Sequence, residues 1–246
     1  MHWWAVILIG AGVGFVAGLF GKGGSAIATP LLHAAGVPAF VAVAAPLPAT
    51  IPSTMAASVP YWRLRMFNRR LIGWSVAFGV PATIVGALAS RWVGGGALIV
   101  ITDLVVIGIG VRSLIGRREI GPAVKVDDIS VPRLAAVAVV VGLAAGLLAN
   151  SGGFLLAPLY LAVLRLPIKQ AFATSLVVSS LLAIPGTIVH IALGHIDWTV
   201  VVVFGLASIP LANAGARVAI RIDAGRLERF YGFGLVTLGA VMLAIR

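Results

Sequence analysis

The chain has 246 residues, of which 61% are hydrophobic and only 10% are charged, and its mean hydropathy is +1.12. This composition excludes a soluble globular domain, the absence of strict alternation argues against a membrane β-barrel, and the absence of cysteine excludes disulfides and thiolate metal sites. The 18 Lys and Arg residues outnumber the 7 Asp and Glu residues, but they stand in short loops between apolar segments, so we interpret them as topology signals and phospholipid contacts rather than as a nucleic-acid surface.

The first predicted helix covers about residues 3–20 and runs into a glycine-rich break at residues 18–25. Gly10, Gly14 and Gly18 recur at every fourth position, which gives this helix one smooth face for close packing against another helix. A short apolar helix is predicted at about residues 25–35.

A proline-rich helix follows at about residues 39–61, with prolines at 46, 48, 52 and 60. Each interior proline removes a backbone donor and frees a carbonyl one turn earlier. In lipid, such freed groups are tolerated only against protein or a water-filled cavity, so this helix is a candidate cavity wall. Helices at about residues 71–93 and 97–115 complete the first half.

The clearest polar stretch covers residues 117–132 and separates a first membrane repeat, residues 1–116, from a second, residues 133–246. The second half repeats the plan of the first. Its predicted elements are helices at about 134–149, 170–193, 199–220 and 227–245, a break at 150–153, and a short helix at about 154–164.

The two halves match in their glycines and prolines. Gly14, Gly18 and Pro30 fall on Gly142, Gly146 and Pro158 at a single offset. We therefore predict an all-α, polytopic helical membrane protein built from two sequence repeats, each with a glycine-broken helix and a short half-helix. A repeat of this kind indicates a membrane transporter whose site lies at the breaks.

The two short segments decide the topology. If they dip into the membrane and return as separate loops, the basic stretches 63–70 and 217–229 lie on opposite sides, against the positive-inside rule. If each completes a crossing, the basic loops all lie inside, both termini lie outside, and the repeats are inverted. We expect this second arrangement. Each short helix covers only about half of the hydrocarbon core at about 1.5 Å per residue, so extended backbone at the breaks must supply the rest.

Several motifs resemble a known family. The second half carries Gly146, Ser151-Gly152-Gly153, Pro158, Leu166-Pro167, Ala171-Phe172-Ala173-Thr174-Ser175-Leu176 and Gly194-His195-Ile196-Asp197-Trp198. This pattern resembles the hallmark of the TauE/SafE family of sulfite exporters, and the resemblance covers nearly the whole chain. The first half departs from it: Ala44-Ala45-Pro46-Leu47 stands where the family usually has Gly-Thr-Ser-Leu, and Lys22 lies inside the first break.

The breaks supply the predicted substrate-binding residues. A helix N-terminus offers unpaired backbone N–H groups and about half a positive charge, and glycine lets the backbone approach an anion closely. Hydroxyls at the start of the helix at 170–193 add donors. The alternative is that the glycines only permit close packing and that the hydroxyls satisfy backbone carbonyls. The candidates are Gly21, Lys22, Gly23, Gly24 and Ser25, then Asn150, Ser151, Gly152 and Gly153, with Thr174 and Ser175.

Three further residues have two interpretations each. Lys22 either attracts the anion or extends to lipid phosphates. Asp103 lies inside an apolar run, where it is either a proton-coupling carboxylate or a protonated acid bonded to a neighbouring helix. His190 lies late in its helix and is either a proton relay or a packed, hydrogen-bonded residue.

Taken together, the residues and the resemblance imply a secondary transporter, an exporter of a small sulfur-containing anion such as sulfite or an organosulfonate. The alternative is a channel for anions or another small solute. No enzymatic constellation, metal-ligand spacing or cofactor motif is present in the sequence. The expected location is the cell membrane, of the bacterial inner-membrane type. The expected partners are the anion and the bilayer, and a homodimer is compatible with the sequence.

Overall fold

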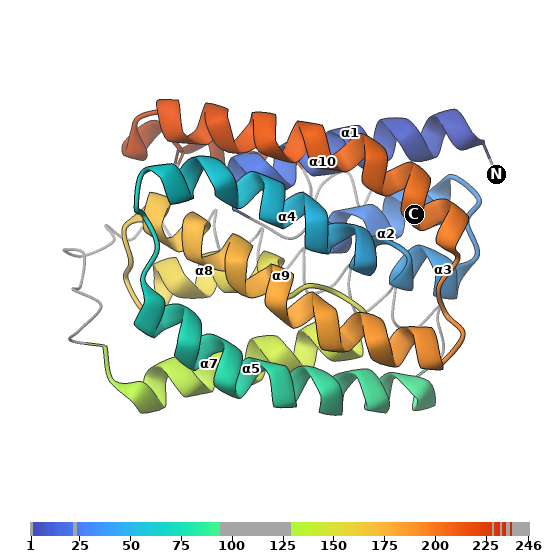
Figure 1. The fold of residues 1–246 in the computed structure, drawn as a ribbon, viewed down its shortest axis with the longest axis horizontal. Helices are drawn as coiled ribbons and strands as arrows, with labels where there is room; N and C mark the ends of the chain where they lie inside the picture. The colour runs from blue at the N-terminus through green and yellow to red at the C-terminus, as the bar shows by residue number, and fades with distance from the viewer. Residues whose placement is uncertain are drawn as a thin grey trace.

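The computed structural model describes residues 2–21, 24–93, 129–227, 229–231, 233–234 and 237, and every regular element in these ranges is helical. The long helices run along one common axis (Figure 1). Lys22, Gly23, Asp103, the predicted helix at 97–115 and nearly all of the polar linker lie outside the described residues.

The first half begins with the predicted helix, its break and its short helix. Its elements are α1 (Trp3–Phe20), α2 (Ser25–Ala34), α3 (Ala39–Ala44), α4 (Pro46–Arg63) and α5 (Arg69–Ala89), followed by a 3₁₀ turn (Ser90–Trp92). The predicted helix at 39–61 is thus divided at Ala45. The next residue, Pro46, has no N–H with which to continue the hydrogen-bond ladder of α3.

The described part of the second half begins with two helices joined by the second break and continues with two long helices. They are α7 (Val131–Leu147), α8 (Gly153–Ala162), α9 (Ile168–Ala192) and α10 (Trp198–Arg221), and residues 224–227 and 229–231 are also helical. Asp197 caps α10, since its carboxylate accepts hydrogen bonds from the N–H groups of Thr199 and Val200.

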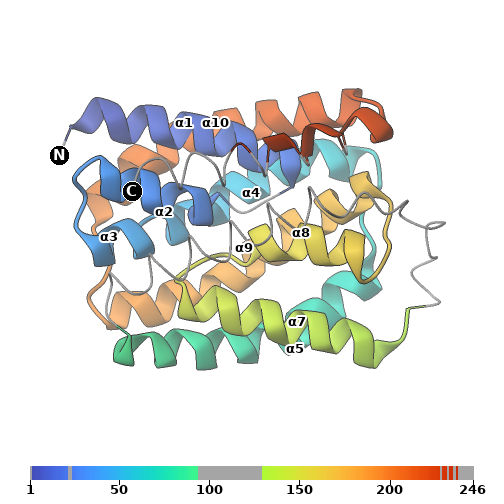
Figure 2. The same cartoon turned by 180° about the vertical axis from the view of Figure 1, so that it is seen from behind.

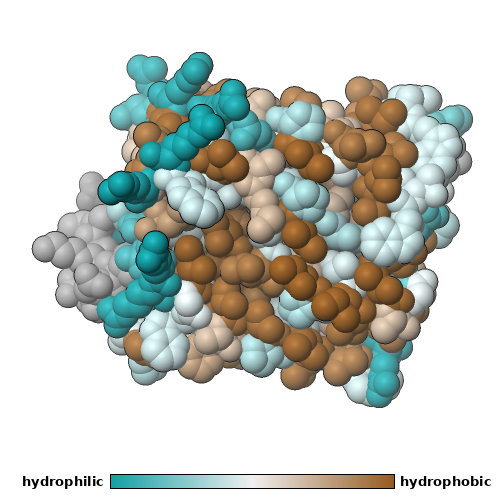
Figure 3. Space-filling view, viewed as in Figure 1, coloured by the Kyte–Doolittle hydropathy of each residue, from teal (hydrophilic) through white to brown (hydrophobic). Residues whose placement is uncertain are grey.

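Within the described residues, five helical segments are long and apolar enough to cross a membrane: Trp3–Phe20, Ala39–Arg63, Arg69–Trp92, Ile168–Ala192 and Trp198–Arg221. Their outward side chains form a wide hydrophobic band across the molecule (Figure 3). Large apolar residues such as Leu8, Ile188 and Leu206 are more than half exposed, as expected where lipid is the solvent. The structure is therefore that of a polytopic helical membrane protein.

Each short helix turns back along the helix that precedes it. After α1 the chain reverses, and α2 returns to the end that holds the N-terminus; α8 returns in the same way along α7 (Figures 1 and 2). A Cβ atom on Gly24 would contact Val13, in the middle of α1, and one on Gly152 would contact Val141 in α7. The short helices therefore start deep inside the bundle.

Glycines bring two pairs of helices into backbone contact. Gly14 and Gly18 of α1 lie against Ser208 and Ala212 of α10, while Gly142 and Gly146 of α7 lie against Gly79 and Thr83 of α5. A Cβ atom on Gly18 or Gly146 would overlap the facing carbonyl oxygen. Because lipid is as apolar as these helices, the hydrophobic effect does not drive their association. Close van der Waals packing therefore holds each pair of helices together.

Charge separates the two ends of the bundle. Within the described ranges, every Lys and Arg except Arg91 lies at one end, which we call the basic end and which forms the hydrophilic side in Figure 3. One hydrogen bond joins two helices at this end: the Lys169 Nζ atom, in the first turn of α9, donates to the carbonyl of Ile220, near the end of α10, at 2.8 Å. At the opposite end, Phe40 stacks on His195 with their ring centroids 4.7 Å apart.

Candidate functional site

The two breaks meet in the interior of the bundle. The Ser25 hydroxyl, at the start of α2, donates to the Asn150 side-chain oxygen at 2.7 Å and accepts from the backbone N–H of Ser151 at 3.2 Å. The Ser25 and Ser151 hydroxyl oxygens are 3.4 Å apart. All three side chains are buried. Residues that are 125 positions apart in the chain thus form one polar cluster, which we call the break cluster: Ser25, Asn150 and Ser151.

The backbone at each break requires a left-handed conformation. α1 ends at Gly21 with φ 62°, and α8 is preceded by Gly152 with φ 73°, both in the region that glycine enters at little cost. Ala149, just before the second break, has φ 45°. The Asn150 side-chain oxygen also accepts from the Gly152 N–H at 3.3 Å, which holds the second turn in place.

Two helix N-termini converge on the break cluster. α2 begins at Ser25 and α8 begins at Gly153, and the two helices run from the cluster toward opposite ends of the bundle. The first-turn N–H groups of a helix lack partners within the helix, and they carry its positive dipole end. Neither short helix has an acidic residue in its first turn. The arrangement therefore offers backbone donors and positive potential from two directions.

The start of α9 reaches the first break. The Ser175 hydroxyl forms hydrogen bonds with the carbonyl of Gly21 and, at 2.9 Å, with that of Phe172. Thr174 is fully buried, and its hydroxyl has no hydrogen-bond partner among the described residues. A buried hydroxyl without a partner is costly, so Thr174 stands out among the predicted site residues as one whose hydroxyl is unused by the described residues.

Further buried hydroxyls lie on α4, α9 and α10. Ser180 donates to the carbonyl of Ile51 at 3.3 Å, and Ser53 of α4 pairs with Ser208 of α10 at 2.7 Å. Ser179 and Thr187 are also buried, with no hydrogen-bond partner among the described residues. Sequence reasoning did not single out these four serines or Thr187. The sequence feature that could have indicated them is the presence of hydroxyl side chains inside apolar helices. This feature is a weak indication of a site, because Ser and Thr in helices also hydrogen-bond to their own backbone.

The histidine at the end of α9 connects the second break to the outer turn. His190 Nε2 lies 3.4 Å from the carbonyl oxygen of Gly146, and its Nδ1 lies 3.1 Å from Nδ1 of His195. Since a carbonyl only accepts, Nε2 of His190 is the donor, and a neutral His190 accepts at Nδ1 from His195. Partial burial lowers the pKa of His195, which lies in the turn outside the helices, below its ordinary value.

The structure therefore unites some of the predicted site residues and leaves others apart. Ser25, Asn150, Ser151 and Gly152 lie together, and Ser175 joins Gly21. His190 contacts the helix before the second break rather than the break cluster itself. Lys22, Gly23 and Asp103 lie outside the described residues, so their predicted roles stay predictions.

The sequence pattern of the family described as "Sulfite exporter TauE/SafE" matches residues 6–242 of the chain. A "Probable membrane transporter protein" of Xylella fastidiosa (strain 9a5c) is 26% identical over 247 residues, covering 98% of this chain and 94% of the relative. The "Probable membrane transporter protein YjnA" of Bacillus subtilis (strain 168) is 25% identical over 240 residues, covering 91% of this chain and 93% of the relative. No solved structure matches the chain significantly.

Proposed function

The chain belongs to the TauE/SafE sulfite exporter family, and we propose that it is a secondary transporter of a small sulfur-containing anion, such as sulfite or an organosulfonate, which binds at the break cluster. The family membership makes the protein a multi-pass membrane transporter. The observation that carries the proposed site is the contact of Ser25 with Asn150 and Ser151, which joins the two breaks between opposed helix N-termini.

The chemistry of the cluster suits an oxyanion. Sulfite and sulfonates present several acceptor oxygens and no strong donor, so a site for them needs donors. The N-termini of α2 and α8 and the unpartnered hydroxyl of Thr174 supply donors without a fixed negative charge. Lys22 precedes Ser25 by three positions in the sequence and adds a positive charge beside the first break.

The packing of the helices supports two inverted repeats. Gly14 lies against Ser208, while its counterpart Gly142 lies against Gly79, so the first helix of each half packs on the third long helix of the other half. α1 and α7 run in opposite directions (Figure 1). In this proposal the repeats cover residues 1–116 and 133–246, the basic end faces the cytoplasm, and both termini lie outside.

Transport requires the break cluster to open to each side in turn. Ser25, Asn150 and Ser151 are buried, so an anion reaches them only when one helical hairpin, α1–α2 or α7–α8, moves relative to its neighbours. Rocking of two inverted halves around a fixed central site is the established physical route to alternating access.

The test is uptake of labelled sulfite into liposomes that contain the purified protein, with and without unlabelled sulfite or taurine-like sulfonates inside. We expect saturable uptake that internal substrate accelerates. Uptake that neither saturates nor responds to internal substrate indicates a channel. No sulfite or sulfonate flux through correctly folded, inserted protein contradicts the proposed substrate class.

The site is tested with Gly24→Val and Gly152→Val. The added side chains crowd the start of α2 and the turn before α8, so we expect transport to fall to background while the protein still inserts. Gly12→Val is the matched control, because a Cβ atom at Gly12 meets nothing within 4 Å. Normal flux in both break variants contradicts binding at the breaks.

A further inference from the structure

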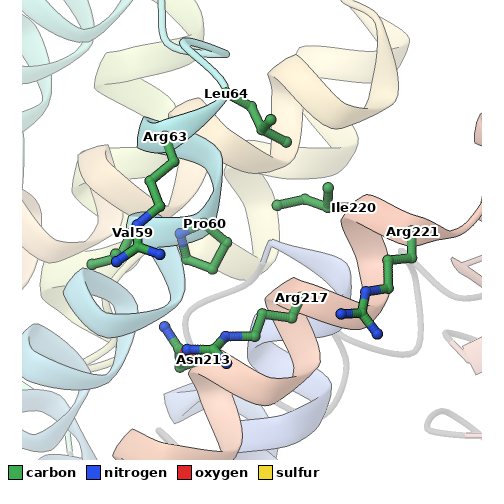
Figure 4. Close-up of a pocket in the computed structure, with 8 residues that line it drawn as sticks. All are labelled: Val59, Pro60, Arg63, Leu64, Asn213, Arg217, Ile220 and Arg221. Atoms are coloured by element: carbon green, nitrogen blue, oxygen red, sulfur yellow. The ribbon is translucent and has the colours of Figure 1, made fainter.

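A groove at the basic end lies between the last turns of α4 and α10 and has a volume of about 310 Å³ (Figure 4). Three arginines and several apolar side chains line it. The lining residues are Val59, Pro60, Arg63 and Leu64 of α4 and its C-cap, and Asn213, Arg217, Ile220 and Arg221 of α10.

The floor of the groove is fixed by two hydrogen bonds to backbone carbonyls. Pro60 has no N–H, so the carbonyl of Ala56 loses its partner within α4. The Asn213 side-chain amide donates to this carbonyl at 2.6 Å and joins α10 to α4 below the arginines. Lys169 donates to the carbonyl of Ile220 and joins the end of α10 to α9. The backbone that carries the arginines is therefore held in place by these contacts between helices.

The groove concentrates positive charge, and no acidic residue is among the side chains that line it in the described part of the chain. Arg63, Arg217 and Arg221 line one cavity, and in the part of the chain that the structure describes none of them forms an ion pair with a carboxylate. Guanidinium groups are planar, carry five donors each and match phosphate oxygens in geometry. Like charges held together repel one another, so an anion in the groove relieves a local electrostatic cost.

The surroundings of the groove indicate that it opens to lipid. Val59 and Leu64 are 41% and 50% exposed, and the neighbouring Trp62 is 72% exposed. Exposed apolar side chains together with tryptophan next to arginines mark the membrane–water interface. The break cluster lies much deeper, at the level of Val13 in the middle of α1, so the groove is separate from the proposed transport site.

We propose that this groove is a binding site for an anionic phospholipid. The phosphate of the headgroup binds among Arg63, Arg217 and Arg221, and the acyl chains extend toward the hydrocarbon core past the apolar residues Val59 and Pro60, one turn deeper in α4. An anionic phospholipid both pairs with the arginines and covers the apolar side chains, whereas a free oxyanion only pairs with the arginines. Bound lipid would bridge α4 of the first half and α10 of the second.

The test is native mass spectrometry of the purified full-length protein titrated with phosphatidylglycerol and, separately, with phosphatidylcholine. The variant is the triple substitution Arg63→Gln, Arg217→Gln and Arg221→Gln. The matched control removes the same charge from the same end outside the groove, with Arg65→Gln, Arg133→Gln and Arg165→Gln. We expect wild type and control to bind phosphatidylglycerol in preference to phosphatidylcholine, and the groove variant to bind it about tenfold more weakly.

Two outcomes overturn the proposal. Equal loss of phosphatidylglycerol in the groove variant and the control shows that net charge alone attracts the lipid. Full displacement of phosphatidylglycerol by millimolar inorganic phosphate or sulfite assigns the groove to a free oxyanion. Thermal unfolding of all three proteins in detergent is followed in parallel, and lipid that raises the melting temperature of the wild type and control but not of a folded groove variant supports the site independently.

Discussion

The two helix breaks fall at matching positions in the sequence, yet the structure holds them in different ways. At the first, Gly21 takes the left-handed conformation, and its carbonyl accepts a hydrogen bond from Ser175 at the start of α9. At the second, Ala149 takes the same conformation and belongs to one apolar cluster with Val43 and Ala44 of α3. The residue in the left-handed conformation is thus held by a side-chain hydrogen bond at the first break and by apolar packing at the second, where the hydrogen bond from the Gly152 N–H to Asn150 holds the turn that follows.

The difference originates in the helices that face the breaks. α9 runs without interruption through Thr174 and Ser175, whereas the corresponding segment of the first half is divided between α3 and α4 at Ala45-Pro46. Neither of these two residues has a hydroxyl. The two segments therefore differ in their side-chain donors: α9 carries the hydroxyls of Thr174 and Ser175, whereas residues 45 and 46 carry none.

The largest effect is expected where the two halves are alike. Gly18→Leu and Gly146→Leu both place a side chain where a carbonyl oxygen of the neighbouring helix stands, and backbone cannot yield cheaply. We expect each variant to lose most of its folded protein, with a cost of about 3 kcal/mol or more. Fluorescence-detected size-exclusion chromatography measures the monodisperse fraction.

The controls for this prediction are Gly12→Leu and Gly73→Leu, since a Cβ atom at either position meets nothing within 4 Å. If only one of the two interface variants fails to fold, the packing of the two halves is less alike than the contacts indicate. If the control variants lose as much folded protein, the added apolar side chain itself, rather than a clash at a helix contact, is responsible for the loss.

The sequence predicts most of this architecture. Helix positions and breaks follow from runs of apolar residues interrupted by glycine, and the start of α2 at Ser25 agrees with the prediction. The contact of Ser25 with Asn150 could not be predicted, because a single sequence gives no distance between residues 125 positions apart. The same limit applies to Asn213, whose partner is a carbonyl freed by Pro60 in another helix.

The next largest effect is expected at the break cluster. Ser25→Ala removes the hydroxyl that donates to Asn150 and accepts from the Ser151 N–H, leaving a buried oxygen and a buried N–H with fewer partners. We expect a loss of stability of about 1–3 kcal/mol, together with a fall in transport. Unfolding in detergent and liposome uptake measure the two effects.

Ser90→Ala is the matched control for Ser25→Ala. Ser90 is equally buried, but its hydroxyl donates to the carbonyl of Ala87, in the last turn of the preceding helix α5, and to no other group among the described residues. We expect little change in transport in this variant. Equal losses in the two variants would show that the break cluster has no special role and that only hydroxyl burial matters.

A smaller effect is expected on exchanging the residues of the two left-handed positions. In Gly21→Ala, a Cβ atom overlaps Phe172 and the backbone becomes strained, so the melting temperature should fall. In Ala149→Gly, the strain at φ 45° is relieved at the cost of a more flexible unfolded chain, so we expect a change of only about 1 kcal/mol or less. A large loss in Ala149→Gly would show that the methyl group in the apolar cluster, rather than the turn, holds the second break.

The smallest effect is a pH dependence at the end of α9, where it contacts the helix that leads into the second break. His195 donates to His190, which donates to the carbonyl of Gly146, whereas Gly18 in the corresponding position packs against Ala212. Burial lowers the pKa of His195, so folding favours its neutral form. The contribution of His195 to the free energy of unfolding is therefore fully present above the ordinary histidine pKa of about 6.5, and it is lost as the pH falls below that value.

We expect the melting temperature of the wild type to drop between pH 7.5 and pH 5 by more than that of His195→Gln, in which the titrating ring is absent. Phe40→Ala should also reduce the drop, because it removes the ring stacked on His195 and exposes the imidazole to water. The two variants distinguish the effect of burying His195 from the effect of its hydrogen bond. If only His195→Gln reduces the drop in melting temperature, the contact of His195 with His190 is the source of the pH dependence. An equal drop in all three proteins would place the pH dependence elsewhere and remove this distinction between the two breaks.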